Sequence, residues 1–268
     1  MSILSRKDID EGARKQFMLD TNCPDTVDHS DKICINERAE LKGARVVEGM
    51  STFFKAIIFR GKAYIMADNA ILDWTRERCE GCLPEWFCKY ENLRILDRKL
   101  NEFGYEIADT HVYMLPDVEA DENEYEEKSG FTEEWLYDRE IEEWGKKWGK
   151  DNPFPHALVY SKTQPDRIAL LLRGSVDRDT LFAMSGVSED SEALWQIGID
   201  VLPEFGGRGL ATYLTDMMKR KVLSLGHIPF YGTSESHSLS MDTGIRAGFL
   251  PAWTEVFCRR IREEAKRG

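Results

Sequence analysis

The fold of this chain is decided by the stretch Ile199-Asp200-Val201-Leu202-Pro203-Glu204-Phe205-Gly206-Gly207-Arg208-Gly209-Leu210-Ala211. Its apolar start is typical of the end of a β-strand, Pro203 ends that strand, and a glycine-rich turn then leads directly into an amphipathic helix. Glycines let backbone N–H groups point outward without steric cost, and the N-terminus of a helix adds partial positive charge. The stretch therefore predicts a site that can hold a pyrophosphate.

Two common nucleotide-binding folds do not fit this turn. A dinucleotide fold needs a third small residue after Gly207-Arg208-Gly209, where Thr212 stands, and it needs parallel neighbouring strands. The Lys-Ser/Thr pair of an NTP-binding loop is also missing. The pattern on both sides of the turn instead predicts a mostly antiparallel sheet, because the links between successive strands are short and turn-like. We expect strands at 157–160, 168–172, 183–187, 194–201, 229–233 and 253–257, and helices at 209–225 and 238–247.

The N-terminal part of the chain predicts a smaller α+β unit. Two β-runs at 53–59 and 63–66 are joined by a turn, and helices at 70–78 and 92–103 precede a strand at 111–114. An acidic block then covers 117–127, with seven acids in eleven positions and no base. Such a block repels itself and is usually a solvated connector. We therefore expect an N-terminal domain at 1–118 with a role on the acceptor side, a linker at 119–130 and a second domain at 131–268.

Two motifs in this order resemble those of the GNAT superfamily of N-acetyltransferases. Val201-x-Pro203 with Gly206-x-x-Gly209-x-Ala211 is similar to its acetyl-CoA signature, and His237-x-x-Ser240 followed by Ala247-Gly248-Phe249 is similar to its second motif. The run 195–201 together with Tyr231-Gly232-Thr233 further resembles a bacterial two-domain subgroup. The resemblance covers about 131–261 and implies an α+β chain, in which a mixed, mostly antiparallel, splayed sheet is flanked by helices.

The resemblance also implies a function. An acetyl group would pass from acetyl-CoA directly to a primary amine on a small-molecule or peptide acceptor, whose identity stays open. The net charge of −12 favours a cationic acceptor. The alternative is a non-catalytic, acyl-CoA-binding regulatory protein, because the tyrosine that often protonates the departing thiolate would fall at Gly244. The resemblance implies the following cofactor-binding residues: Ile199, Asp200 and Val201 for pantetheine, Gly206, Gly207, Arg208, Gly209, Leu210, Ala211 and Thr212 for the pyrophosphate, and His237 and Ser240 from the second motif.

The catalytic residues stay open between alternatives. Ser240, Tyr231 or a water would replace the missing acid, and Trp195 or Gln196 stands where some relatives carry a catalytic glutamate. Each candidate also has a structural alternative, such as capping for His237 and Asp200, solvation in a polar turn for the acids near 190, and packing for Trp195. The candidates for the general base are Asp190, Glu192, Asp200 and His237.

Composition limits the remaining possibilities. The chain has 268 residues, 42% of them hydrophobic, which is ample for a packed core and excludes a wholly disordered chain. Its 48 acidic against 36 basic residues argue against nucleic-acid or anionic-membrane binding. No signal peptide or apolar run of about 18 residues is present, so we expect a cytoplasmic protein without a membrane span. The Cys79-x-x-Cys82 pair with Cys88 lacks a fourth ligand, which predicts reduced thiols and no metal site. The oligomeric state stays open.

Overall fold

The computed structural model describes residues 4–24, 32–119 and 130–262, and the chain divides into two compact units. The first, here called the C-terminal unit, consists of Met1–Ala13 and Tyr113–Pro251, and the second, the N-terminal unit, of Arg14–Val112 and Ala252–Gly268. This division differs from the expected domains at 1–118 and 131–268, because the last strand of the chain pairs with β2 of the N-terminal unit. The expected linker at 119–130 lies outside the described residues, apart from its two end residues.

The C-terminal unit is built on a mixed, mostly antiparallel sheet. Its strands follow the order β4-β9-β8-β7-β6-β5, in which β5 to β8 are antiparallel and β8 and β9 are parallel. The expected α+β class with a mixed, mostly antiparallel sheet flanked by helices is confirmed. The strands are β4 (Tyr105–Pro116, from Tyr113 onward), β5 (Phe131–Tyr137), β6 (Asp166–Gly174), β7 (Leu181–Glu189), β8 (Leu194–Val201) and β9 (Ile228–Thr233).

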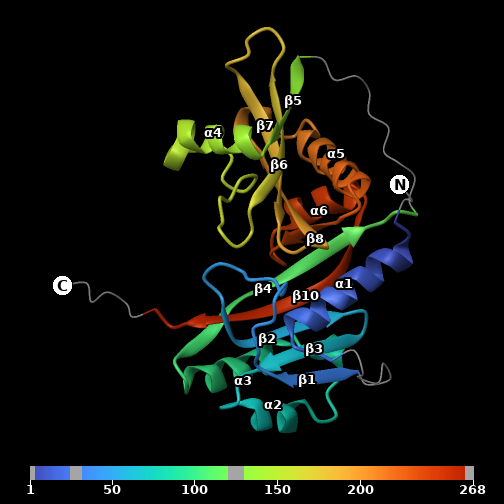
Figure 1. Ribbon diagram of the computed structural model, residues 1–268, viewed down its shortest axis with the longest axis vertical. Coiled ribbons are helices and arrows are strands. Elements are labelled where there is room, and N and C mark those ends of the chain that lie inside the picture. Colours follow the sequence, from blue (N-terminus) through green and yellow to red (C-terminus); the bar gives the residue numbers. More distant parts are fainter. Residues whose placement is uncertain (1–3, 25–31, 120–129, 263–268) are drawn as a thin grey trace, which may run out of the picture. The chain divides into compact units, whose positions relative to one another are not determined.

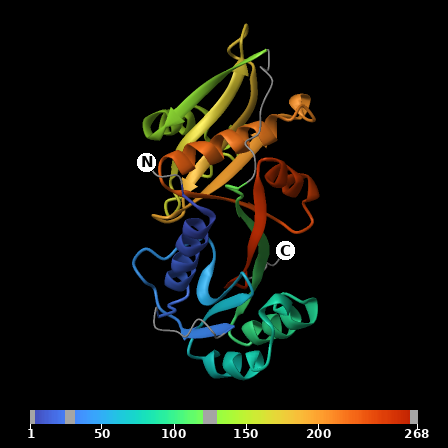
Figure 2. The same ribbon diagram turned by 90° about the vertical axis from the view of Figure 1, so that its right-hand side faces the viewer.

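Helices cover both faces of this sheet (Figure 1). On one face, α5 (Leu210–Ser224) buries Leu214 and Met218 in a core that also contains Ile197 of β8. On the other face, α4 (Asp138–Trp148) buries Trp144 in a separate core with Leu171 of β6. Figure 2 shows α5 crossing over the strands. A shorter helix, α6 (Ser238–Arg246), follows β9.

In the N-terminal unit the strands pair in the order β1-β3-β2-β10-β4. β2 and β3 form a hairpin whose turn residues, Arg60 and Gly61, have φ of 48° and 75°. Two positive φ values favour the right-handed twist of the paired strands, so the expected turn is confirmed. One face packs against α2 (Leu72–Cys79) and α3 (Tyr90–Asn101), and on the other Phe17 of α1 (Arg6–Asp20) packs on Phe59. The remaining strands are β1 (Ile33–Glu37), β2 (Ser51–Phe59), β3 (Lys62–Ala67) and β10 (Phe249–Arg260, from Ala252 onward).

A buried ionic cluster ties this unit together. The Arg45 Nε atom lies 2.6 Å from Asp20 Oδ2, and its Nη2 atom lies 2.5 Å from Glu255 Oε1, which also accepts a hydrogen bond from Trp253 Nε1. Burial works against the charge of Arg45, yet the two carboxylates outweigh it and raise the pKa of the guanidinium. The cluster therefore joins segments 210 residues apart, between Arg45 and Glu255.

Most sequence-predicted elements are present, and one is wrong. Residues 157–160 do not form a strand but a loop on the sheet, whose Ala157 and Tyr160 N–H groups bond to carboxylates of Asp200 and Asp166 instead of a neighbouring strand. The elements α1, α4, β1 and β5 had not been predicted. Within the described residues, no helix is both long and apolar enough to span a membrane.

Candidate functional site

Strands β8 and β9 separate partway along their length. Their parallel register runs over four pairs, from Leu194↔Ile228 to Ile197↔Tyr231, while β8 continues to Val201. We call residues 198–201 of β8 the splayed edge. β8 remains paired with β7 along its other side as far as Val201, so only the side toward β9 opens.

The register decides which backbone groups face this opening. Leu202 N–H donates to Phe182 O at 2.9 Å, toward β7, whereas Ala193 O accepts from Ile228 N–H at 2.9 Å, toward β9. Successive residues of a strand point their backbone groups to alternate sides. Odd-numbered residues, including Ile199 and Val201, therefore direct their N–H and C=O groups into the splay. Asp200 directs its own toward β7, unlike the backbone role that the resemblance implied.

The glycine-rich turn follows directly after the splayed edge. Residues 203–205 form a short 3-10 helix, and Gly207 and Gly209 both adopt φ of 72°, a region that favours glycine. The first α5 hydrogen bond runs from Tyr213 N–H to Gly209 O, so the N–H groups of Leu210, Ala211 and Thr212 precede the helical ladder. A Cβ atom at Gly207 would meet nothing within 4 Å. The turn therefore has the donors, the helix terminus and the room that a pyrophosphate needs.

Arg208 lies at the outer surface of this turn. Its Nη2 atom donates to Glu204 O at 3.2 Å, and the guanidinium stands 5.1 Å from the centre of the Phe205 ring. Gly206, which takes the first Arg/Gln position of the motif, has φ of −58°. Arg208 is thus the cation that the turn offers to a ligand.

The last pair before the splay contains a candidate proton donor. Tyr231 is 3% exposed, and its hydroxyl lies 2.8 Å from Ser240 Oγ on α6. Burial raises the pKa of the phenol, although the hydrogen bond with Ser240 works in the opposite direction. A Cβ atom at Gly244 would lie 3.0 Å from Tyr231 Cδ1. The ring of Tyr231 therefore lies directly against the position where the family motif has its tyrosine.

Asp200 and a residue that sequence reasoning missed form a dyad at the splayed edge. The Asp200 Oδ1 atom lies 2.6 Å from His156 Nδ1, and Oδ2 accepts the N–H groups of His156 at 2.7 Å and Ala157 at 2.9 Å. An ionised carboxylate only accepts hydrogen bonds, so Nδ1 carries a hydrogen, and in the neutral imidazole Nε2 then has the lone pair. The imidazole is exposed while the Asp200 side chain is mostly buried.

Two glycines explain why this loop lies flat on the sheet. A Cβ atom at Gly198 would stand 1.9 Å from His156 O, and one at Gly186 would stand 1.9 Å from Ala157 O. Only the absence of a side chain on both strands lets the loop backbone come so close. A lone histidine 44 residues from its partner carries no local sequence signal, although the glycine at 198, inside a predicted strand, is a typical mark of close backbone approach.

The other candidate bases are not brought to the splayed edge. Asp190 is 7% exposed and accepts hydrogen bonds from Gln164 Nε2 and Ser188 Oγ in the turn between β7 and β8, at the end of β8 away from the glycines. Glu192 lies in the same turn. His237 is exposed at the N-terminus of α6, where its side chain makes no capping hydrogen bond.

Trp195 belongs to the core of the C-terminal unit. It is 8% exposed, and its ring stacks on His227 with the ring centres 4.1 Å apart. This favours its packing role. Among the described residues, no group of three or more His, Cys, Asp or Glu side chains is arranged to hold a metal ion, and no disulfide joins any of the six cysteines.

Comparison with known proteins finds similarity only at the level of structure. No family model matches, and no curated protein matches. Similar solved structures include a GCN5-related N-acetyltransferase from Kribbella flavida (17% identity, TM-score 0.43, 63% of this chain and 65% of that one). Another is a GNAT-family protein from Novosphingobium aromaticivorans (16% identity, TM-score 0.40, 59% of this chain and 69% of that one). A third is a GCN5-related N-acetyltransferase from Sphaerobacter thermophilus (14% identity, TM-score 0.41, 62% of this chain and 56% of that one). The chain spans less than two thirds of the Kribbella and Sphaerobacter proteins.

Proposed function

We propose that this chain is an acetyl-CoA-dependent N-acetyltransferase of the GNAT type, which moves an acetyl group directly to a primary amine. One observation carries the proposal: the splayed edge of β8 leads without interruption into a glycine turn at a helix N-terminus. Extended backbone groups and an anion cradle are thereby arranged in line, which suits a ligand with an amide-containing arm and a pyrophosphate.

The residues that would hold acetyl-CoA divide by chemistry. Ile199 and Val201 offer backbone groups to the pantetheine amides in the manner of an added strand. The N–H groups of the turn and of the first α5 residues offer donors to the pyrophosphate, with Arg208 as the nearby cation. When bound, acetyl-CoA supplies the activated acyl group.

The chain's own residues would then manage two protons. Tyr231, whose buried phenol has a raised pKa and shares a hydrogen bond with Ser240, would donate a proton to the departing thiolate. His156, whose exposed imidazole is held by Asp200, would take the proton from the amine. Ile197 is the strand partner of Tyr231, and Asp200 lies three residues, about 10 Å, further along β8. The proton would therefore pass from the amine to His156 through intervening water.

The acceptor is best sought among cationic amines, both small molecules and peptide N-termini, because the net charge of −12 favours an approaching cation. The alternative of a non-catalytic regulator depends on position 244, where a glycine replaces the tyrosine that would donate a proton to the thiolate. The ring of Tyr231 lies against that position, so no observation within the described residues favours the alternative.

Calorimetric titration with acetyl-CoA and with free CoA tests the proposal. We expect micromolar binding of both, and loss of binding in Gly209→Glu, which puts a carboxylate and a strained φ into the cradle. A panel of polyamines, amino acids and peptides then tests transfer. Absence of binding by the wild-type chain, or equal affinity in the folded Gly209→Glu variant, would overturn the assignment.

A further inference from the structure

The N-terminal unit contains a cavity of about 270 Å³ that the proposed transferase chemistry does not use. It lies between α2, the 3-10 helix Pro84–Trp86 and α3, over the start of β2. Phe54 and Leu96, which are 1% and 5% exposed, contribute to its lining. Leu83 and Trp86, 49% and 56% exposed, lie on its solvent side. The walls are therefore mainly apolar and the cavity is reachable from solvent.

Arg78 is a cation of this cavity that bonds to neutral groups. Arg78 Nη2 donates to Asn92 Oδ1 at 2.7 Å, and its Nη1 atom lies 4.0 Å from Cys82 Sγ, so its closest contacts are an amide and a thiol. Within the described residues, no carboxylate forms an ion pair with it, whereas Arg76 on the same helix pairs with Asp73 at 3.2 Å. In a chain with 48 acidic residues, this leaves a partly buried guanidinium ready for an external anion.

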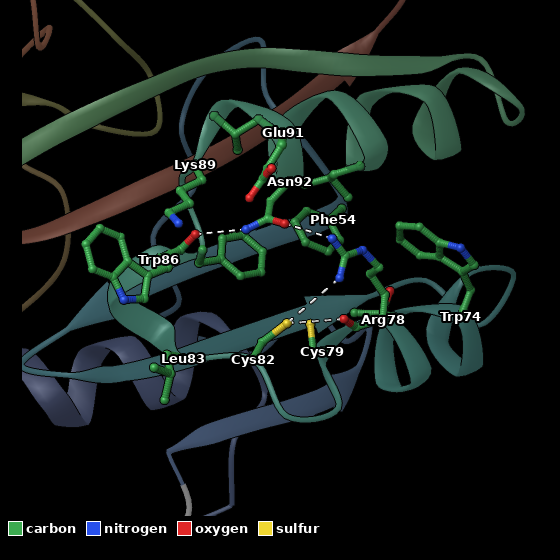
Figure 3. Close-up of a pocket in the computed structure, with 14 residues that line it drawn as sticks. Phe54, Trp74, Arg78, Cys79, Cys82, Leu83, Trp86, Lys89, Glu91 and Asn92 are labelled. Atoms are coloured by element: carbon green, nitrogen blue, oxygen red, sulfur yellow. Dashed lines mark hydrogen bonds between the residues drawn. The ribbon is translucent and has the colours of Figure 1, made fainter.

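The polar groups of the cavity are gathered around this guanidinium. Figure 3 shows Arg78 between Asn92 and the two cysteines, with Trp86 and Lys89 across the cavity. Asn92 Nδ2 donates to Trp86 O at 2.9 Å, which holds its oxygen toward Arg78. Burial, and then the neighbouring Cys82, raise the pKa of the Cys79 thiol to about 11, so this thiol adds no charge at neutral pH.

A second cation and one anion complete the charge pattern. Lys89 Nζ stands 4.6 Å from the centre of the Trp86 ring, so an aromatic surface and a positive charge occur together on the solvent side. Glu91 also lines the cavity and is exposed. Two cations against one carboxylate favour an anionic ligand, and the apolar floor favours an aromatic or aliphatic body.

We propose that this cavity binds a small amphipathic carboxylate, whose apolar body lies on Phe54, Leu96 and Trp86 and whose carboxylate bonds to Arg78. The site is independent of the proposed transferase chemistry. It can therefore be tested by binding alone, whatever the outcome of the acetyl-CoA experiments.

Calorimetric titration of the full chain with three probes of one shape tests this inference: 4-phenylbutyrate, 4-phenylbutanol and 4-phenylbutylamine. We expect the carboxylate to bind at least tenfold more tightly than the alcohol, and the amine to bind most weakly. In Arg78→Gln, whose amide can still donate to Asn92, the Kd of the carboxylate should rise at least tenfold while that of the alcohol changes less than twofold. Arg76→Gln on the same helix is the matched control and should leave all three values unchanged.

Three results would overturn the inference. The first is no binding of 4-phenylbutyrate at millimolar concentration. The second is tighter binding of the amine, which would make Glu91 the deciding charge. The third is an equal loss of all three probes in Arg78→Gln when its circular dichroism spectrum and melting temperature match the wild type.

Discussion

The dyad of His156 and Asp200 allows two substitutions that separate a chemical role from a structural one. His156→Gln removes the imidazole but keeps the backbone N–H that bonds to Asp200 Oδ2, so the loop stays anchored. Asp200→Asn keeps the size of the side chain but turns one acceptor oxygen into an N–H₂ donor. The two variants therefore perturb the same pair from opposite sides.

The magnitude follows from the three hydrogen bonds that Asp200 accepts. In Asp200→Asn, the remaining amide oxygen can keep both backbone donors, at 2.7 and 2.9 Å in the wild type, which leaves the new N–H₂ group facing His156 Nδ1. Nδ1 must then accept, so the hydrogen moves to Nε2 and the imidazole can no longer take a proton there. Losing general-base catalysis costs about 10²–10⁴ in rate, or about 3–5 kcal/mol of transition-state stabilisation. Weakening charge-assisted bonds to neutral ones costs only about 1–2 kcal/mol of folding stability.

Two assays check this reasoning. Nitrogen NMR of labelled histidine should show the Nδ1–H tautomer of His156 in the wild type and the Nε2–H tautomer in Asp200→Asn, with His156→Gln used to assign the signal. Kinetics with the best acceptor amine should show that both variants lose rate to a similar extent while the affinity for acetyl-CoA is kept. A wild-type rate in folded His156→Gln would refute the base role and reduce the dyad to a loop anchor.

Three further changes test other parts of the structure. Tyr231→Phe should lower the transfer rate about 10²-fold or more without changing CoA affinity. Because burial raises the pKa of this phenol, the unfolded chain loses its proton first as the pH rises. The melting temperature of the wild type should therefore fall above about pH 10 more steeply than that of the variant. Arg45→Met leaves the buried carboxylates of Asp20 and Glu255 without their cation and should lower the free energy of unfolding in urea by about 3–5 kcal/mol. Arg38→Gln, at a more exposed pair with Asp68, should lower it by less than about 1 kcal/mol. Equal losses in the two variants would contradict the ionic-cluster reasoning. Gly198→Ala puts a methyl group 1.9 Å from His156 O and should lower the free energy of unfolding by about 1–3 kcal/mol. It should also weaken the contact between His156 and Asp200, which the His156 NMR signal reports. Unchanged stability would show that the loop does not depend on this glycine.

The part of the fold that the sequence predicts best is the part with strong local signals. Strand β8 is found at the predicted residues 194–201, and α5 begins and ends within one residue of the prediction, because a strand, a proline, three glycines and an amphipathic repeat follow one another. The hairpin of β2 and β3 was likewise marked by its Arg60-Gly61 turn. In each case the physical constraint lies within about ten residues of chain.

The parts that failed depend on contacts between distant segments. The apolar residues 157–160 match a strand, but they pack as a loop because Gly186 and Gly198 leave room for their backbone. Asp200 accepts the N–H group of Ala157, and Asp166 accepts those of Val159 and Tyr160. Tyr231 could be named as a candidate acid, yet its contact with Gly244 depends on how α6 returns to β9. Within the part of the chain that the structure describes, Arg78 bonds to Asn92 and not to a carboxylate, which the sequence alone does not predict because it depends on which side chains the fold brings near.

The pairing of β10 with β2 has a consequence for how the protein is made. The first half of the chain leaves the ribosome without β10 and without Glu255, the partner of Arg45 that lies 210 residues further on. At about 5–20 residues per second, that partner follows Arg45 only after about 10–40 seconds. Throughout this time the edge of β2 that β10 will cover is open and Arg45 lacks one of its two carboxylates. The N-terminal unit therefore cannot complete its fold before the C-terminal unit has been synthesised. The N-terminal unit is therefore completed only after β10 has been made, and a chain that lacks β10 would leave β2 and Arg45 without their native partners.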